Sequence, residues 1–409
     1  MLHYSPPSKT TVRNAGPWPQ KEERMLSRFH YSITLPDHSG WHQDTGYSPL
    51  MADILTQAFT LIRRSSHDAA GFARALAVIR PFLDAPMCHH QRLRVFYLVA
   101  LARSAIGHQD AALFWLDEML NLGDQVRDTS DLADAYHLRG GINRALSRLR
   151  DASADYRTCL ALLNDQAERN PLAPAQATNA VKVRAELAGF EFFLGHYELA
   201  QHLTHEARLL LHHDISHTIE EATISWIQSL LDRWAGRPEQ ALEHARLAAD
   251  VFTELGSPAS AARIQTVLAD TILDIAERIP TGSERERVLK RSWPHIQLAL
   301  SLAKEAQDQP GLGPARLARL RYLRLRGADQ PRLPTIEHIA RLGERLADEG
   351  LIAYAFTAMG DELLASGDRN GARAHYRDAL GVLDGSDVSA VGKWALRALR
   401  LIEEMWDEV

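Results

Sequence analysis

Small residues return at a constant spacing inside apolar, helix-like stretches of this chain. One stretch carries a small residue, a turn follows seven residues later, and the next stretch carries two marker positions that are again seven residues apart. Five units can be followed: Ala100, Gly107, Ala112 and Met119; Gly140, Ser147, Ala152 and Cys159; Ala188, Gly195, Ala200 and Ala207; Ser229, Gly236, Ala241 and Ala248; Gly360, Gly367, Ala372 and Ala379. Such a repeat predicts stacked helical hairpins, because each unit buries its apolar face only against its neighbours.

The spacing has a physical reason in how two helices cross. Antiparallel helices approach closely only where the facing side chains are small, so each hairpin needs Ala, Gly, Ser or Cys at its crossing points. The turn glycines are expected to end the first helix in the left-handed conformation that glycine adopts without strain. Ser147 replaces the glycine in the second unit, which predicts a weaker cap there.

These residues resemble the tetratricopeptide repeat (TPR) family, which has small residues at helix crossings, a turn glycine and a later alanine pair. The best local matches run from Leu187 and Ala188 through Gly195, His196 and Tyr197 to Ala200 and Ala207, and from Gly360 through Gly367 and Asp368 to Ala372, Tyr376 and Ala379. Successive turns at 107, 147, 195 and 236 are 40, 48 and 41 residues apart. The plain repeat has roughly 34 residues, and the longer units are similar to the sensor arrays of large bacterial transcriptional regulators.

The resemblance implies an all-α fold, a right-handed α-solenoid of TPR-like helical hairpins with a C-terminal capping helix. About seven to eight hairpins are expected in a continuous solenoid over residues 48–409, and the capping helix over about 388–406. The hairpins are expected at about 49–83, 90–122, 131–163, 177–212, 219–254, 259–307, 314–347 and 351–383. Residues 1–47 are rich in Pro and Gly and are expected to form a mostly disordered arm, whose aromatic residues either dock on a surface or stay unused.

Three charged residues depart from the plain repeat. Arg139, Glu191 and Asp232 stand where the first helix would carry an apolar or aromatic residue, which predicts that the first helices are shifted by about one position. In the fourth unit the buried stripe is then expected at Ile227, Leu230, Leu231 and Trp234, at helical spacing.

Composition and charge narrow the class of partner. The 409 residues are 45% hydrophobic and 24% charged, and the net charge of −6 disfavours binding to nucleic acid over the whole surface. Arginines gather at Arg316, Arg319, Arg321, Arg324 and Arg326, which is expected to be a solvated helix face; an acidic or RNA partner is the alternative. The chain shows neither a leader nor an apolar run long enough to span a membrane, so a cytoplasmic location is expected.

Catalytic and metal-binding motifs are absent from the pattern. There is no nucleophile elbow, phosphate-binding glycine loop or His-Glu-x-x-His pair, which favours a non-enzymatic protein without a cofactor. His202 and His205 have a spacing compatible with shared metal ligation, but no cysteine or carboxylate completes a ligand motif, so no metal is expected.

The expected superhelix predicts where a partner binds. Stacked hairpins form a long concave surface lined by the first helix of each pair, and such a groove binds peptides or helices. Candidate lining residues are Tyr97, His137, Arg144, Trp226 and Arg233, although Tyr97 and Trp226 also suit the core.

The resulting hypothesis is a protein- or peptide-binding module, an adaptor or the sensor part of a bacterial regulatory system. The alternatives are a ligand- or signalling-peptide-gated switch and an RNA-binding helical repeat, and self-association through the edges of the solenoid stays open.

Overall fold

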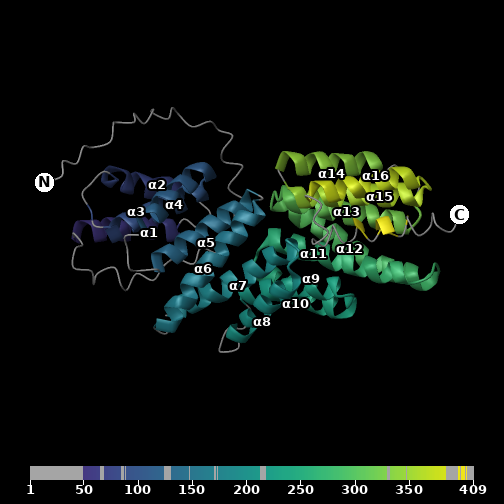
Figure 1. Ribbon diagram of the computed structural model, residues 1–409, viewed down its shortest axis with the longest axis horizontal. Helices are drawn as coiled ribbons and strands as arrows, with labels where there is room; N and C mark the ends of the chain where they lie inside the picture. Colours follow the sequence, from purple (N-terminus) through teal and green to yellow (C-terminus); the bar gives the residue numbers. More distant parts are fainter. Residues whose placement is uncertain are drawn as a thin grey trace.

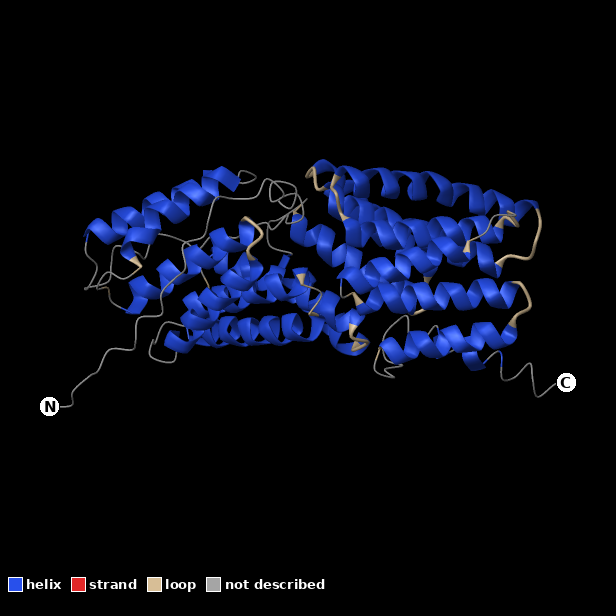
Figure 2. Cartoon of the chain, turned by 90° about the horizontal axis from the view of Figure 1, so that it is seen from above, coloured by secondary structure: helices blue, strands red, loops and turns tan. Residues whose placement is uncertain are grey.

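The computed structural model describes residues 49–64, 69–83, 87, 89–123, 130–146, 148–169, 172, 174–211, 218–328, 332–346 and 348–383, and residues 395–396, 398–400 and 402 near the C-terminus. All regular structure in these ranges is helical (Figure 2). None of the described helices is both long and apolar enough to cross a membrane. The expected arm of residues 1–47 lies outside the described residues.

Sixteen α-helices and one 3-10 turn follow one another in these ranges. They are α1 (Pro49–Arg64), α2 (Ala69–Ile79), η3 (Arg80–Phe82), α3 (His89–Ala105), α4 (Gln109–Gly123), α5 (Ser130–Ala145), α6 (Leu149–Arg169), α7 (Pro174–Phe193), α8 (Tyr197–Leu211), α9 (Ile219–Trp234), α10 (Pro238–Glu254), α11 (Pro258–Arg278), α12 (Ser283–Glu305), α13 (Gln309–Leu325), α14 (Leu333–Leu346), α15 (Glu349–Ala365) and α16 (Arg369–Val382).

The helices follow one another along an elongated stack (Figure 1). Each odd-numbered helix packs against the even-numbered helix that follows it, and most odd-numbered helices also pack against the next odd-numbered one. No two even-numbered helices pack closely in the described part of the chain. The odd-numbered helices are therefore the inner row and the even-numbered helices the outer row, and the predicted all-α solenoid of TPR-like hairpins is confirmed.

The hairpin turns have the geometry that the glycine spacing predicts. Four turn glycines have φ angles between +77° and +90°: Gly107, Gly195, Gly236 and Gly367. The N–H group after each glycine donates to the carbonyl five residues earlier, as from His196 to Glu191 at 2.7 Å and from Arg237 to Asp232 at 2.8 Å. This is the Schellman arrangement, which satisfies carbonyls at the end of the first helix. The same bond closes the second unit, from Arg148 to Asn143 at 2.9 Å.

Small residues at the helix crossings are required by large side chains opposite them. A Cβ on Gly140 would lie 2.4 Å from the ring of Tyr156, and one on Gly360 would lie 2.5 Å from the ring of Tyr376. Both tyrosine rings are almost fully buried, so neither can move aside without opening the core. The described residues after α16 also pack in this way: Ala395, Ala398, Leu399 and Ile402 are buried against Ala372, Tyr376 and Ala379. Most other residues of the predicted capping helix, among them Trp394 and Trp406, lie outside the described residues.

Candidate functional site

The charged residues that depart from the plain repeat hold the hairpin turns. The Glu191 side chain is 0% exposed and accepts hydrogen bonds from Ser153 Oγ at 2.6 Å and Arg157 Nη2 at 2.7 Å, and its Oε2 lies 2.6 Å from His196 Nδ1. Asp232 is buried in the corresponding place and accepts from Arg237 Nη2 at 2.6 Å. Burial raises the pKa of Glu191, but its hydrogen bonds outweigh burial and hold that pKa below its ordinary value.

These pairs change the interpretation of the register. The departures were expected to shift the first helices by about one position, yet Glu191 and Asp232 stay buried because each has a cationic partner. In the fourth unit Ile227, Leu230 and Leu231 are buried as predicted, whereas Trp234 is 40% exposed and stacks on the ring of Tyr197 at 3.9 Å between centroids.

Two of the five predicted lining residues meet on the inner row, at Glu186. His137 Nε2 on α5 lies 3.3 Å from Glu186 Oε2 on α7, and Arg144 Nη1 lies 3.6 Å from Glu186 Oε1. Nearby, Asn179 Nδ2 donates to Asp134 Oδ1 at 3.3 Å. We call these residues, with the buried Lys182, the α5–α7 network.

Charge within this network is compensated. Burial raises the pKa of Glu186, but Arg144, His137 and Lys182 outweigh burial and hold that pKa well below its usual range. Burial also lowers the pKa of His137, against a smaller opposing effect of its hydrogen bond to Glu186. The network therefore favours the ionised form of Glu186 and disfavours the protonated form of His137.

Tyr97 and Trp226 take part in the core. Tyr97 on α3 is buried in the first hydrophobic cluster, and burial together with Asp134 and Asp131 raises the pKa of its hydroxyl. Trp226 on α9 is partly buried, packs against two core clusters and meets the Phe252 ring edge to face. Its Nε1 is buried without a hydrogen-bond partner among the described residues.

Arg233 belongs to a second network, on four inner helices. Its Nε donates to Asp274 Oδ2 on α11 at 2.6 Å, and Arg321 Nη2 on α13 donates to Asp274 Oδ1 at 2.7 Å. Tyr354 on α15 donates its hydroxyl to Asp270 on α11 at 3.2 Å. We call this the α9–α15 network. Arginines on both sides of Asp274 outweigh its burial and keep its pKa below the ordinary range.

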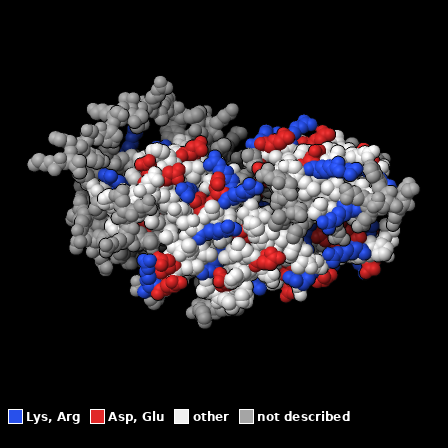
Figure 3. Space-filling view, in the orientation of Figure 1, with Lys and Arg blue, Asp and Glu red and all other residues white. Residues whose placement is uncertain are grey.

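The arginine cluster around residue 321 is thus only in part the solvated helix face that the charge pattern suggests, because Arg319 and Arg326 are exposed but Arg321 is buried. The Arg321 side chain is 8% exposed and also pairs with Glu277 at 2.7 Å, while Arg324 pairs with Asp361 at 3.0 Å and Arg326 with Glu286 at 3.1 Å. These guanidinium groups have carboxylate partners within the chain, which leaves less positive charge for a phosphate backbone. On the face shown in Figure 3, basic and acidic side chains are interspersed.

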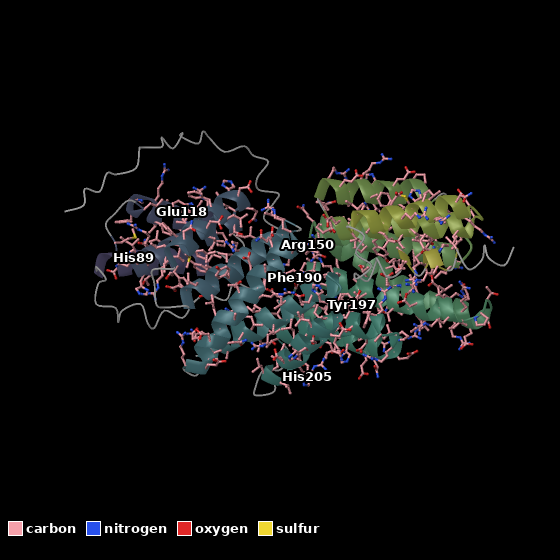
Figure 4. All side chains as sticks on the ribbon, viewed as in Figure 1. His89, Glu118, Arg150, Phe190, Tyr197 and His205 are labelled. Carbon is pink, nitrogen blue, oxygen red and sulfur yellow. The ribbon has the colours of Figure 1, made fainter. Side chains whose placement is uncertain are left out.

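Within the described residues, no three His, Cys, Asp or Glu side chains gather in a way that could hold a metal ion. His202 Nε2 lies 3.9 Å from Glu206 Oε1 on the same helix, and His205 lies at the outer edge of the stack on α8, away from Phe190 on the inner row (Figure 4). The histidines of α8 therefore do not join either inner network.

The sequence comparisons give no match. No protein-family model matches this chain, and no curated protein matches it either. Solved structures do match. A Rap protein in complex with competence and sporulation factor has a TM-score of 0.59 at 13% identity, covering 88% of this chain and 99% of that chain.

Two further solved structures have a similar fold. The apo form of the quorum sensor NprR from B. thuringiensis has a TM-score of 0.56 at 12% identity and covers 82% of this chain and 87% of that chain. The Rap conjugation gene regulator of the plasmid pLS20, in complex with the Phr* peptide, has a TM-score of 0.54 at 10% identity. The match covers 88% of this chain and 98% of that chain. Over almost the whole length of these proteins, the chain shares their TPR-like helical-repeat fold.

Proposed function

We propose that this protein is a non-enzymatic module that binds a peptide or an extended protein segment on its inner row of helices and acts as a sensor or adaptor in regulation. The observation that carries the proposal is the likeness to regulators over nearly their full length, one of them in complex with a peptide. The likeness concerns the fold, and the inner networks supply the polar surface that such a ligand would meet.

We expect a ligand on the inner row to contact Arg144. Its side chain is 40% exposed and lies 3.6 Å from the buried Glu186, so a ligand can reach its guanidinium from solvent. Arg233, by contrast, is closely paired with Asp274 at 2.6 Å, and Trp226 packs in two core clusters, so replacing either would disturb the fold as well as a binding surface.

The test is a selection of short random peptides on the full chain, followed by affinity measurements of the enriched sequences. Arg144→Ala is expected to weaken their binding about tenfold, the loss typical of one partly buried charge contact. Arg377→Ala is the matched control, because Arg377 is exposed on the outer helix α16. Enriched peptides that ignore Arg144 and depend on outer-row residues, or a selection that enriches no sequence, would overturn the proposal.

A gated switch is the second candidate, and one observation favours it. In the described residues, α5 and α7 are the one pair of successive inner helices that do not pack closely, although side chains of the α5–α7 network bridge them at 3.3–3.6 Å. A ligand that binds better when α5 and α7 approach would tighten the array. Small-angle X-ray scattering should then show a smaller radius of gyration with an enriched peptide; an unchanged radius at saturation contradicts the switch.

A further inference from the structure

The outer row carries cationic side chains that have no acidic partner. Arg246 on α10 and Arg291 on α12 are exposed, and within the described residues neither guanidinium makes an ion pair or a hydrogen bond. Glu243 and Asp250 lie one turn before and one turn after Arg246 on α10, yet neither approaches it within ion-pair distance. This contrasts with the inner row, where Arg233, Arg321 and Arg324 all have carboxylate partners.

The two arginines act on the same histidine. His295 on α12 is partly buried, and its Nδ1 lies 2.7 Å from Gln265 Oε1 on α11, which fixes the ring and leaves Nε2 for another contact. Burial lowers the pKa of His295, and both Arg246 and Arg291 lower it further. Neither guanidinium is neutralised by an ion pair within the described residues, so both stay available to an acidic partner.

Exposed leucines lie beside these charges. Leu247 follows Arg246 and is 40% exposed, and Leu298 lies one turn after His295 and is 45% exposed. On α12, Arg287, Arg291, His295 and Leu298 are four, four and three residues apart, so they share one face of the helix over about 16 Å. We call Arg246, Leu247, Arg287, Arg291, His295 and Leu298 the α10–α12 surface. Both helices pack against α11, and they are successive helices of the outer row (Figure 1).

We infer that the α10–α12 surface docks an acidic amphipathic helix of a partner protein. A helix laid along α12 would place leucine-like anchors on Leu247 and Leu298 and carboxylates against Arg246 and Arg291, at the same helical spacing. Guanidinium groups form two parallel hydrogen bonds with a carboxylate, which makes unpaired arginines a specific receptor for such charges. This surface belongs to the outer row, so the inner row stays available for the peptide ligand proposed above.

The test uses the full chain and three labelled probes. The first is a synthetic helical peptide with leucine along one face and glutamate beside it, the second has glutamine in place of glutamate, and the third is a short single-stranded RNA. Fluorescence anisotropy measures their binding to the protein and to Arg246→Glu with Arg291→Glu. The acidic helix is expected to bind more tightly than the glutamine helix and the RNA, and to lose about tenfold or more in affinity with the double variant.

Matched controls separate the surface from general charge effects. Arg319→Glu with Arg377→Glu changes the net charge equally at two exposed arginines elsewhere and should leave the affinity within about twofold. Leu247→Ser with Leu298→Ser should weaken binding, whereas Leu199→Ser with Leu209→Ser, at exposed leucines of α8, should not. The inference is overturned if the acidic helix does not bind, if the control variants weaken it equally, or if RNA binds more tightly through the same arginines. Circular dichroism checks that every variant is folded.

Discussion

Glycine has two roles in this repeat, one in the turn between helices and one at the helix crossing. Three substitutions distinguish these roles. Gly236 has a φ of +77°, and a Cβ added there would meet nothing within 4 Å. Gly236→Ala therefore costs only the strain of the left-handed backbone, about 1 kcal/mol. Gly360 lies inside α15, where a Cβ would be 2.5 Å from the buried ring of Tyr376. Gly360→Ala must displace that ring, and overpacking of a core adds about 1–3 kcal/mol.

The reverse substitution is available in the same chain. Among the described residues, Gln307 is the one non-glycine residue with a positive φ, at 51°, and it precedes α13 in a turn of the same form. Gln307→Gly relieves the left-handed strain but makes the unfolded chain more flexible, so a net gain of up to about 1 kcal/mol is expected.

Equilibrium urea unfolding followed by far-UV circular dichroism measures all three effects. The expected order of stability is Gln307→Gly, then the unchanged protein, then Gly236→Ala, and last Gly360→Ala. Because repeat arrays can unfold in parts, hydrogen exchange at the amides of α10 and α16 checks that each loss is local to its hairpin. A Gly236→Ala variant as unstable as Gly360→Ala, or a destabilised Gln307→Gly variant, would refute the distinction between turn and crossing glycines.

Three further outcomes follow from the buried charges. Arg321→Met removes a partner of Asp274 and Glu277 and should lower the free energy of unfolding in urea by about 3 kcal/mol. Arg319→Met, at an exposed arginine, should lower it by less than about 0.5 kcal/mol. Equal losses in the two variants would contradict the role of the network. Glu191→Gln should cost about 2 kcal/mol by the same assay, because charge-assisted bonds to Arg157 are lost. Burial lowers the pKa of His137, so its contribution to stability is complete above the ordinary value near 6.5 and is lost as the pH falls below it. His137→Gln should make the melting temperature less dependent on pH below about 6.5. An unchanged dependence of melting temperature on pH would contradict this contribution of His137.

Sequence periodicity predicts the hairpins because the two helices of each repeat pack through the same kind of contact. Gly140 and Gly360 stand sixteen residues before Tyr156 and Tyr376, and the same contact between helices selects the same pair of sizes in both places. Local capping is equally visible in the sequence, since the left-handed turn needs glycine. These features depend on residues within one hairpin, which a single pass along the chain can compare.

The inner networks depend on residues one repeat apart, and the sequence pattern does not pair them. His137 and Glu186 are 49 residues apart, and Arg233 and Asp274 are 41 apart. Each residue alone looks like an ordinary polar position on a helix. A usable signal does exist, because inner helices of successive hairpins pack together, so opposite charges about one repeat apart on the inner face are candidates for ion pairs.

The contact between residues farthest apart in the sequence bears on the proposed ligand site. Tyr354 reaches Asp270 across two repeats, past α13, where Gly313 leaves room for Leu351 of α15 to approach. The inner face between α9 and α15 is thus occupied by closely paired charged groups, and a ligand carboxylate would have to displace Asp274 to reach Arg233. In the α5–α7 network the contacts are longer and Arg144 stays half exposed. Recognition on the inner row should therefore depend on α5 and α7 more than on Arg233.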